Sequence, residues 1–346
     1  MKRVKKVNKL REVGSHGPEA RAAGGHRPLP PPSNSLPPPR IGEAQTSSLS
    51  SPGKMPAFPV LGRPPAGGIS GEQGAALPGP PPTLSSSRKI KVAIIGGSGQ
   101  MGRWFRRFFS DQGLTVLTAD LDTPQTPEDV AALADVVILS VPIAKVVSIV
   151  RDISPQLRPD AALMDITSVK QRPLDAMLKA FAGEVVGTHP LFGPQERSIV
   201  GRTVVLCPGR GERWLHWLKD LLEQAGARVK VTSATEHDRM MAVVQGLSHF
   251  VLIALEKSIR QLGVSPQDLE EYSTPTFATL HRLAKRLLSQ DAQLYACIQL
   301  ANPANRPALR ALEDAVADIL YFIQRQNVDG LVRLMEEIKG GFGQEG

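Results

Sequence analysis

The sequence predicts a doubly wound α/β domain followed by an all-α domain, with a disordered tail in front of both. Three observations support this prediction. Short apolar runs alternate with helix-like segments over residues 88–231. In residues 232–346 the apolar side chains recur at helical spacing. Residues 1–87 are rich in Pro, Gly and Ser and hold 17 of the 30 prolines.

The tail of residues 1–87 cannot bury enough apolar surface to offset the chain entropy of folding, so we expect it to be disordered. Residues 1–89 carry 13 of the 41 basic and 4 of the 33 acidic residues, which leaves the remaining chain close to neutral. The folded part therefore lacks the basic bias of nucleic-acid-binding proteins, and we expect no nucleic-acid partner.

Several broad protein classes are disfavoured by composition. No uninterrupted apolar stretch approaches 18 residues, so we expect no membrane span. The two cysteines, Cys207 and Cys297, suit a reducing compartment and lack metal-ligand spacing, so we expect no metal. The basic start, Lys2–Arg11, lacks the apolar core of a secretory signal. We expect a cytoplasmic protein, with plastid targeting as the less favoured alternative.

Seven apolar runs, separated by helix-like segments and turn residues, predict the strands of a mostly parallel sheet. They are Ile90–Ile95, Thr115–Ala119, Val136–Val141, Ala161–Ile166, Val185–Gly187, Thr203–Cys207 and Arg228–Val231.

A glycine turn joins the first run to the helical segment Trp104–Phe109 and has the spacing G-x-G-x-x-G. Its residues are Gly97, Ser98, Gly99, Gln100, Met101 and Gly102. Such a turn lets main-chain N–H groups and a helix N-terminus hold a diphosphate, so it predicts a Rossmann-type dinucleotide site. Asp120 ends the next strand, where a carboxylate would bind a ribose hydroxyl and favour NAD over NADP. Asp122 is close enough to share that role.

The second domain opens with a capping-box pattern, Ser233 to Glu236, and a long helix reaching about Gly263. This helix is so apolar that we expect it to be buried on most sides. A homodimer formed through this domain would bury it.

Polar residues follow two strands at the edge where a nicotinamide would lie. Ser168 follows the fourth strand, and it could instead cap the next helix. His189 lies in a segment rich in proline and glycine, which predicts an imidazole held on a stiff loop. A histidine can accept a proton near neutral pH, although a structural histidine is the alternative.

The helical domain offers further candidates. Gln245 and His249 are four residues apart on one face of an apolar helix, where a ligand or a core partner would satisfy them. Arg282, Lys285 and Arg286 form a basic cluster that is either a solvated helix face or a clamp for a carboxylate.

Residues 88–340 resemble the prephenate/arogenate dehydrogenase family of tyrosine biosynthesis. The shared motifs are G-G-S-G-Q-M-G (Gly96–Gly102), S-V-P (Ser140–Pro142), D-I-T-S-V-K (Asp165–Lys170), H-P-L-F-G-P (His189–Pro194), E-H-D (Glu236–Asp238), Q-G-L-S-H-F (Gln245–Phe250) and R-L-L-S-Q-D-A-Q-L-Y (Arg286–Tyr295). Two departures are Ala292 in place of a proline and Gln195 in place of an acidic residue.

The resemblance implies oxidative decarboxylation of prephenate to 4-hydroxyphenylpyruvate, with hydride transfer to NAD⁺. It implies that His189 hydrogen-bonds the ring hydroxyl and accepts its proton, and that Ser168 orients both His189 and this hydroxyl. Gln245 and His249 would line the substrate pocket, and Arg286 would bind a carboxylate. Ser140 and Pro142 would adjoin the cofactor.

Other functions remain as alternatives. The enzyme could act on arogenate and give tyrosine directly. A relative that reduces imines or oxidises β-hydroxy acids would share the glycine turn but is not expected to carry H-P-L-F-G-P. A non-catalytic NAD-sensing protein would bind the nucleotide without turnover.

Overall fold

The structure is a computed structural model that describes residues 89–341; the predicted tail lies outside this range. Seven strands form one sheet in the order β2-β1-β3-β4-β5-β6-β7. Neighbouring strands are parallel except for β5 and β6, which confirms the predicted mostly parallel sheet. The strands are β1 (Lys91–Ile95), β2 (Thr115–Ala119), β3 (Val136–Leu139), β4 (Ala162–Asp165), β5 (Glu184–Pro190), β6 (Thr203–Arg210) and β7 (Arg228–Val231).

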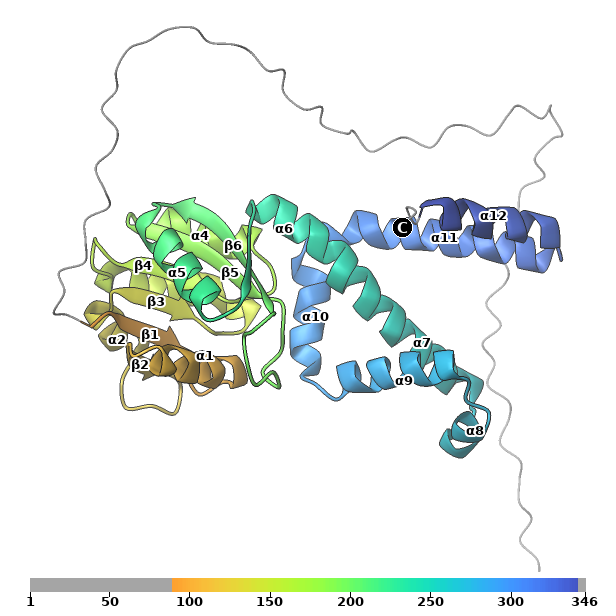
Figure 1. Cartoon of the computed structure of the whole chain (residues 1–346), viewed down its shortest axis with the longest axis horizontal. Coiled ribbons are helices and arrows are strands. Elements are labelled where there is room, and N and C mark those ends of the chain that lie inside the picture. Colours follow the sequence, from red (N-terminus) through yellow and green to blue (C-terminus); the bar gives the residue numbers. More distant parts are fainter. Residues whose placement is uncertain (1–88, 342–346) are drawn as a thin grey trace, which may run out of the picture. The chain divides into compact units, whose positions relative to one another are not determined.

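Helices cover both faces of this sheet (Figure 1). One face packs against α1 (Gln100–Asp111) and α5 (Arg213–Gln224) through an aromatic-rich core. The other face packs against an aliphatic core shared by three helices. These are α2 (Pro127–Leu133), α3 (Val146–Ile153) and α4 (Gln171–Ala180). Short 3₁₀ turns, η1 (Ile143–Lys145) and η2 (Ser154–Gln156), flank α3.

The strand order creates a switch point at β1. From β1 the chain moves to β2 on one side and then returns to β3 on the other. In open α/β sheets, ligands bind at the carboxyl ends of the strands beside such a switch point. The glycine turn follows β1 directly and therefore lies at this position.

Strand β5 is longer than predicted, so the expectation that His189 lies on a loop is wrong. The strand continues to Pro190 because antiparallel β6 pairs with it, with His189 opposite Val205 and Pro190 opposite Val204. The proline is tolerated because β4 pairs with β5 only as far as Gly187, so Pro190 has a neighbouring strand on one side only, as in an edge strand. The His189 main chain is thus fixed by sheet pairing and not by a proline-braced loop.

The second domain is entirely helical in the described residues, as predicted. A continuous helical run comprises α6 (Ala234–Met241), a π-helical segment η3 (Ala242–Leu247) and α7 (Ser248–Leu262). Ser233 caps α6 by accepting the Glu236 N–H, but the Glu236 carboxylate pairs with Arg239 instead of completing a capping box. The remaining helices are α8 (Pro266–Glu271), α9 (Pro275–Leu288), α10 (Ala292–Ala301), α11 (Asn305–Gln324) and α12 (Val328–Gly341).

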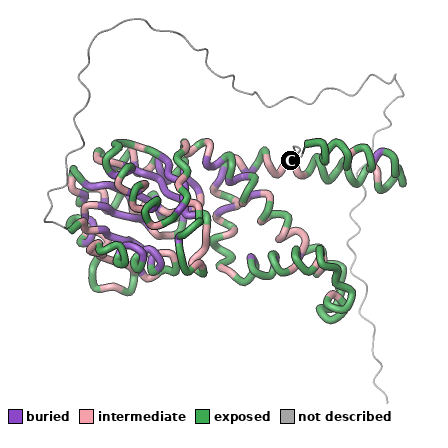
Figure 2. Tube along the Cα trace, viewed as in Figure 1, coloured by how far each residue is buried: buried purple, intermediate pink, exposed green. Residues whose placement is uncertain are grey.

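In a single chain the long helix is not buried on most sides, so the expected burial depends on the homodimer. Figure 2 shows buried residues concentrated in the sheet, whereas α11 and α12 are largely exposed and α7 mixes exposed with half-buried residues. Five apolar side chains of the long helix are 41–54% exposed: Met240, Val243, Val244, Phe250 and Val251. The run Ala234–Leu262 is also long and apolar enough to cross a membrane by length and mean hydropathy, although charged residues interrupt it.

Candidate active site

The glycine turn has the geometry of a diphosphate cradle. A Cβ at Gly102 would lie 2.1 Å from the Gly96 carbonyl oxygen, so only glycine allows α1 to begin this close to β1. Gly96 has a φ of +85° and faces the Ser140 carbonyl at the end of β3. The first turn of α1 carries no acidic residue and no side-chain cap, which leaves its N–H groups suited to an anion. These residues fit a dinucleotide cofactor.

The carboxylates beyond β2 are tied to the same turn. Asp120 accepts hydrogen bonds from the main-chain N–H groups of Ser98 at 2.9 Å and Leu121 at 2.8 Å. The Ser98 hydroxyl donates to Asp122 at 2.9 Å. Asp120 therefore lies where the sequence predicts a ribose-binding carboxylate, and Asp122 remains an alternative.

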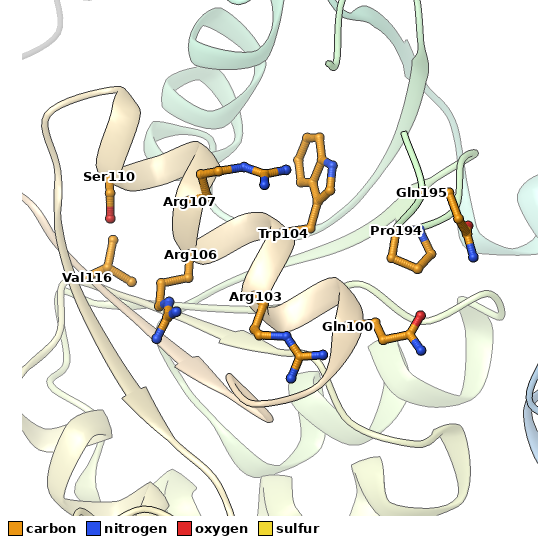
Figure 3. A pocket seen from close by; sticks show the side chains of 9 residues that line it. All are labelled: Gln100, Arg103, Trp104, Arg106, Arg107, Ser110, Val116, Pro194 and Gln195. Atoms are coloured by element: carbon orange, nitrogen blue, oxygen red, sulfur yellow. The ribbon is translucent and has the colours of Figure 1, made fainter. Parts of the chain in front are cut away.

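A basic hollow of about 660 Å³ runs along the outer side of α1 (Figure 3). Its lining residues are Gln100, Arg103, Trp104, Arg106, Arg107, Ser110, Val116, Pro194 and Gln195. Of the predicted site residues only Gln100 belongs to it, and no histidine lines it. We therefore assign the chemistry to the carboxyl edge of the sheet and not to this hollow.

His189 is buried at the carboxyl end of β5 and is 3% exposed. Its Nδ1 lies 2.8 Å from Nε2 of His237, which α6 supplies. Burial, the adjacent His237 and the Lys170 ammonium hold the pKa of His189 well below its usual value. A neutral imidazole at neutral pH can accept a proton, which is the state that a general base requires.

Beneath His189, a fully buried ion pair joins Lys170 to Asp165. The Lys170 ammonium also donates to the Thr188 carbonyl at 2.7 Å, one residue before His189. The Asp165 carboxylate accepts the Thr167 N–H at 3.0 Å as well. This pair connects the end of β4 to the end of β5 and thereby fixes the main chain that carries His189.

Ser168 lies between β4 and α4, at the same edge of the sheet as His189, because Asp165 pairs with Gly187 in the parallel register. Helix α4 begins at Gln171 with Lys170 as its N-cap residue. The alternative that Ser168 caps this helix is therefore wrong. Its half-buried side chain remains available for another role.

Two residues that directly follow predicted site residues pack against the helical domain in one small apolar core. Ile143, directly after Pro142, and Val169, directly after Ser168, pack with Ile298 of α10. This contact brings the carboxyl ends of β3 and β4 against the helix that carries Tyr295. The predicted cofactor and substrate segments therefore belong to one site.

Gln245 lies within the π-helical segment and His249 at the start of α7. In the described part of the chain, Oε1 of Gln245 and Nδ1 of His249 are both buried without a hydrogen-bond partner. Burial lowers the pKa of His249, so this ring favours the neutral state. Single π-helical turns inside α-helices frequently mark functional sites, and unpaired buried polar atoms require a partner such as a ligand.

Arg286 lies on α9 and is exposed. Its charge lowers the pKa of Tyr295, although burial has the larger effect and raises the pKa of that phenol overall. The Tyr295 ring packs edge-on against His249 with a centroid distance of 4.8 Å. The structure therefore links Arg286 to His249 through Tyr295. Arg282 and Lys285 are also exposed on α9.

Sequence reasoning assigned no role to three residues that complete this picture. His237 and Asp238 lie in the quoted E-H-D motif, and Tyr295 ends the last motif. Nothing in their local spacing indicates their partners, since His237 meets His189 across 48 residues. The only sequence signal for these residues was that they lie in two of the motifs shared with the family.

These observations define a two-domain dinucleotide-binding protein whose buried imidazole faces the helical domain. Two family models match it: "Prephenate dehydrogenase, nucleotide-binding domain" over residues 114–231 and "Prephenate dehydrogenase, dimerization domain" over residues 233–337. The chain belongs to the prephenate dehydrogenase family.

Known proteins resemble about three quarters of the chain. It is 33% identical to the T-protein of Enterobacter agglomerans over 73% of this chain and 67% of that protein. It is 29% identical to a probable arogenate/prephenate dehydrogenase of Methanocaldococcus jannaschii, over 74% of this chain and 62% of that protein. The chain thus spans about two thirds of the length of these relatives.

The fold also matches a solved structure. A prephenate dehydrogenase from A. aeolicus, in complex with hydroxyphenyl propionate and NAD⁺, superposes with a TM-score of 0.62 at 24% identity. The match covers 74% of this chain and 98% of that one. It supports the arrangement of a Rossmann-type domain followed by a helical domain.

Proposed function

We propose that the protein oxidises prephenate with NAD⁺ and releases CO₂ and 4-hydroxyphenylpyruvate. The observation that carries this proposal is the buried His189, kept neutral at the carboxyl edge of the sheet, the same edge at which the glycine turn follows β1. Membership of the prephenate dehydrogenase family supports it independently.

The cofactor would be held by the glycine turn, Gly97–Gly102, with Asp120 at a ribose and Ser140 and Pro142 beside it. The chemistry that NAD⁺ supplies when bound is acceptance of a hydride. The carboxylate at the end of β2 disfavours a 2′-phosphate, which supports NAD over NADP.

His189 accepts the proton of the ring hydroxyl in this proposal, and Ser168 helps to orient that hydroxyl. As the hydroxyl carbon loses its hydride, the ring carboxylate leaves as CO₂ and its bonding electrons complete the aromatic ring. Arg286 binds a substrate carboxylate by a charge-assisted contact. The unpaired polar atoms of Gln245 and His249 line the pocket for the rest of the substrate.

The direct test is the purified full chain with prephenate and arogenate, each offered with NAD⁺ and NADP⁺. We expect NADH formation and stoichiometric CO₂ release with prephenate. A preference for arogenate would identify the alternative substrate, and binding of NAD⁺ without turnover of either acid would contradict the proposal.

We further propose that the protein works as a homodimer formed through its helical domain. The matched dimerisation family model and the exposed apolar side chains of α7 and α11 support this. Leu320→Glu on α11 should shift the mass in solution from dimer to monomer, whereas Leu133→Glu on α2 should not. An unchanged dimer in the Leu320 variant would contradict this interface.

We also infer a cytoplasmic location, supported by the two free cysteines, Cys207 and Cys297, which suit a reducing compartment. Fluorescent tagging at the C-terminus in the native host tests this location, and accumulation in a plastid would overturn it.

A further inference from the structure

Behind His189 lies a chain of two buried side chains that the proposed reaction does not use. His237 and Asp238 of α6 are each 2% exposed. Nε2 of His237 lies 2.8 Å from Nδ1 of His189, and Nδ1 of His237 lies 2.8 Å from Oδ1 of Asp238. We call His189, His237 and Asp238 the histidine chain.

Main-chain donors fix the direction of hydrogen bonding at one end of the histidine chain. Asp238 accepts the N–H of Lys170 at 2.7 Å through Oδ1 and the N–H of Gln171 at 3.0 Å through Oδ2. These N–H groups begin helix α4, whose N-cap side chain makes no capping bond of its own. A main-chain N–H can only donate, so both Asp238 oxygens act as acceptors.

The rest of the chain follows from this direction. Because Oδ1 of Asp238 is an acceptor, the hydrogen of neutral His237 lies on Nδ1 and its Nε2 is an acceptor. The hydrogen of neutral His189 must then lie on Nδ1, where it donates to His237. Nε2 of His189 is left with a free lone pair, which is the nitrogen that can accept a proton.

We propose that His237 and Asp238 are positioning residues that set the tautomer of His189 and stabilise its cation after proton transfer. This inference rests on the proposed function of His189 as the base. In the step, the substrate O–H bond breaks and an N–H bond forms at Nε2. The Nδ1–H bond is kept, and it donates more strongly to His237 once the ring is charged.

The charged groups around His189 leave this role to Asp238. Lys170 is paired with Asp165, but its charge still lowers the pKa of His189 and so opposes the imidazolium. On β6, the buried Cys207 thiol has a pKa raised to about 12, mainly by burial, and so stays neutral. Among the described residues, Asp238 is thus the carboxylate that is hydrogen-bonded to His189 through His237 and can stabilise the charged imidazolium.

The test compares two substitutions of His237. His237→Leu removes the acceptor for the His189 N–H, whereas His237→Gln keeps a carbonyl oxygen that can accept it. We expect the leucine variant to lose about 10–10²-fold in kcat, with KM for prephenate and NAD⁺ within about twofold. The glutamine variant should retain kcat within about threefold. Equal losses in both variants, or a normal kcat in the leucine variant, would overturn the proposal.

A double variant separates this inference from the proposed function. In a His189→Asn background, His237→Leu should cause no further loss of kcat, because its effect acts through the base. If His189→Asn alone keeps near-normal turnover, the proposed role of His189 fails. If His189→Asn is inactive and adding His237→Leu lowers the residual rate further, only the histidine chain fails.

The tautomer of His189 can also be measured by NMR in the wild-type protein, so this test does not depend on whether the His237 variants fold. In ¹⁵N-histidine-labelled wild-type protein, the His189 resonances, assigned by their loss in His189→Asn, should report hydrogen on Nδ1 and none on Nε2. Hydrogen on Nε2 in the free enzyme near neutral pH would overturn the assigned tautomer, whatever the substrate proves to be.

Discussion

The sheet side and the helical side of the candidate site differ in how fully one chain completes them. On the sheet side, His189 and Lys170 are buried and each is hydrogen-bonded to a neighbour. On the helical side, Gln245 and His249 keep buried polar atoms without partners in the described residues, and Arg286 is exposed.

This difference indicates a division of labour. The groups that we propose to move a proton are preorganised by strand pairing and by α6, so no ligand is needed to form them. The groups that we propose to recognise substrate lie on helices whose apolar faces are still open in one chain. In this proposal they acquire their partners from the substrate or from a second copy.

The largest expected effect concerns the preorganised side. His189→Asn should lower kcat by about 10²–10⁴-fold, with little change in KM, because only proton transfer is lost. Steady-state kinetics with prephenate and NAD⁺ would measure it. Near-normal turnover would show that His189 is not the general base. The proposed difference between the sheet side and the helical side would then be wrong.

Substitutions in the buried ion pair of Lys170 and Asp165 should lower the stability of the folded protein. Lys170→Met leaves the Asp165 carboxylate buried without its cation and should lower the free energy of unfolding by about 3–5 kcal/mol. Urea unfolding would measure this loss. The matched control is the double variant Lys170→Met with Asp165→Asn, which should recover part of the stability; no recovery would mean that packing, not charge, holds this corner.

The helical side should respond in binding and not in turnover. Arg286→Ala should raise KM for prephenate by about 10–10²-fold through loss of a charge-assisted contact, with a smaller change in kcat. Arg282→Ala, an exposed arginine on the same helix, is the control and should change KM little. If the Arg282 variant shows the larger effect, the carboxylate clamp lies one helical turn earlier.

The smallest effect is a pH dependence. The pKa of His189 is lowered, so between the folded and unfolded values this group binds a proton only in the unfolded chain. Its contribution to stability is therefore complete above about 6.5, the ordinary histidine pKa, and is lost as the pH falls toward the folded value.

Two pH titrations would test this sign. Denaturant unfolding of wild type should show a steeper loss of stability below pH about 6.5 than the His189→Asn variant. The kcat/KM profile should also stay flat above that value and fall only in more acidic solution. Equal stability slopes in the two proteins would show that His189 titrates normally.

Much of this architecture was predictable because the signals are local. The strands Thr115–Ala119 and Arg228–Val231 appear with the predicted bounds, since each is a short apolar or β-branched run between turn residues. Ser233 caps the long helix through a contact only three residues away. The glycine turn likewise needs nothing beyond its own spacing and the strand before it.

The predictions that proved wrong concern features of the structure that depend on contacts between segments far apart in the sequence. β5 extends through His189 because β6 pairs with it, which no property of the segment itself requires. Ser168 fails to cap α4 because Asp238, from the other domain, meets those N–H groups. The apolar face of the long helix stays partly exposed in one chain because no other described segment of that chain packs over it.

The sequence by itself determined the order of the two domains, the nucleotide turn and the set of side chains able to do the chemistry. These depend on residue type and on spacing within a few residues, which local sterics and hydrogen bonding fix. Only the tertiary structure decided which of them touch. The burial that lowers the pKa of His189 and the contact with His237 arise when strand β5 packs against helix α6, which brings together two histidines 48 residues apart.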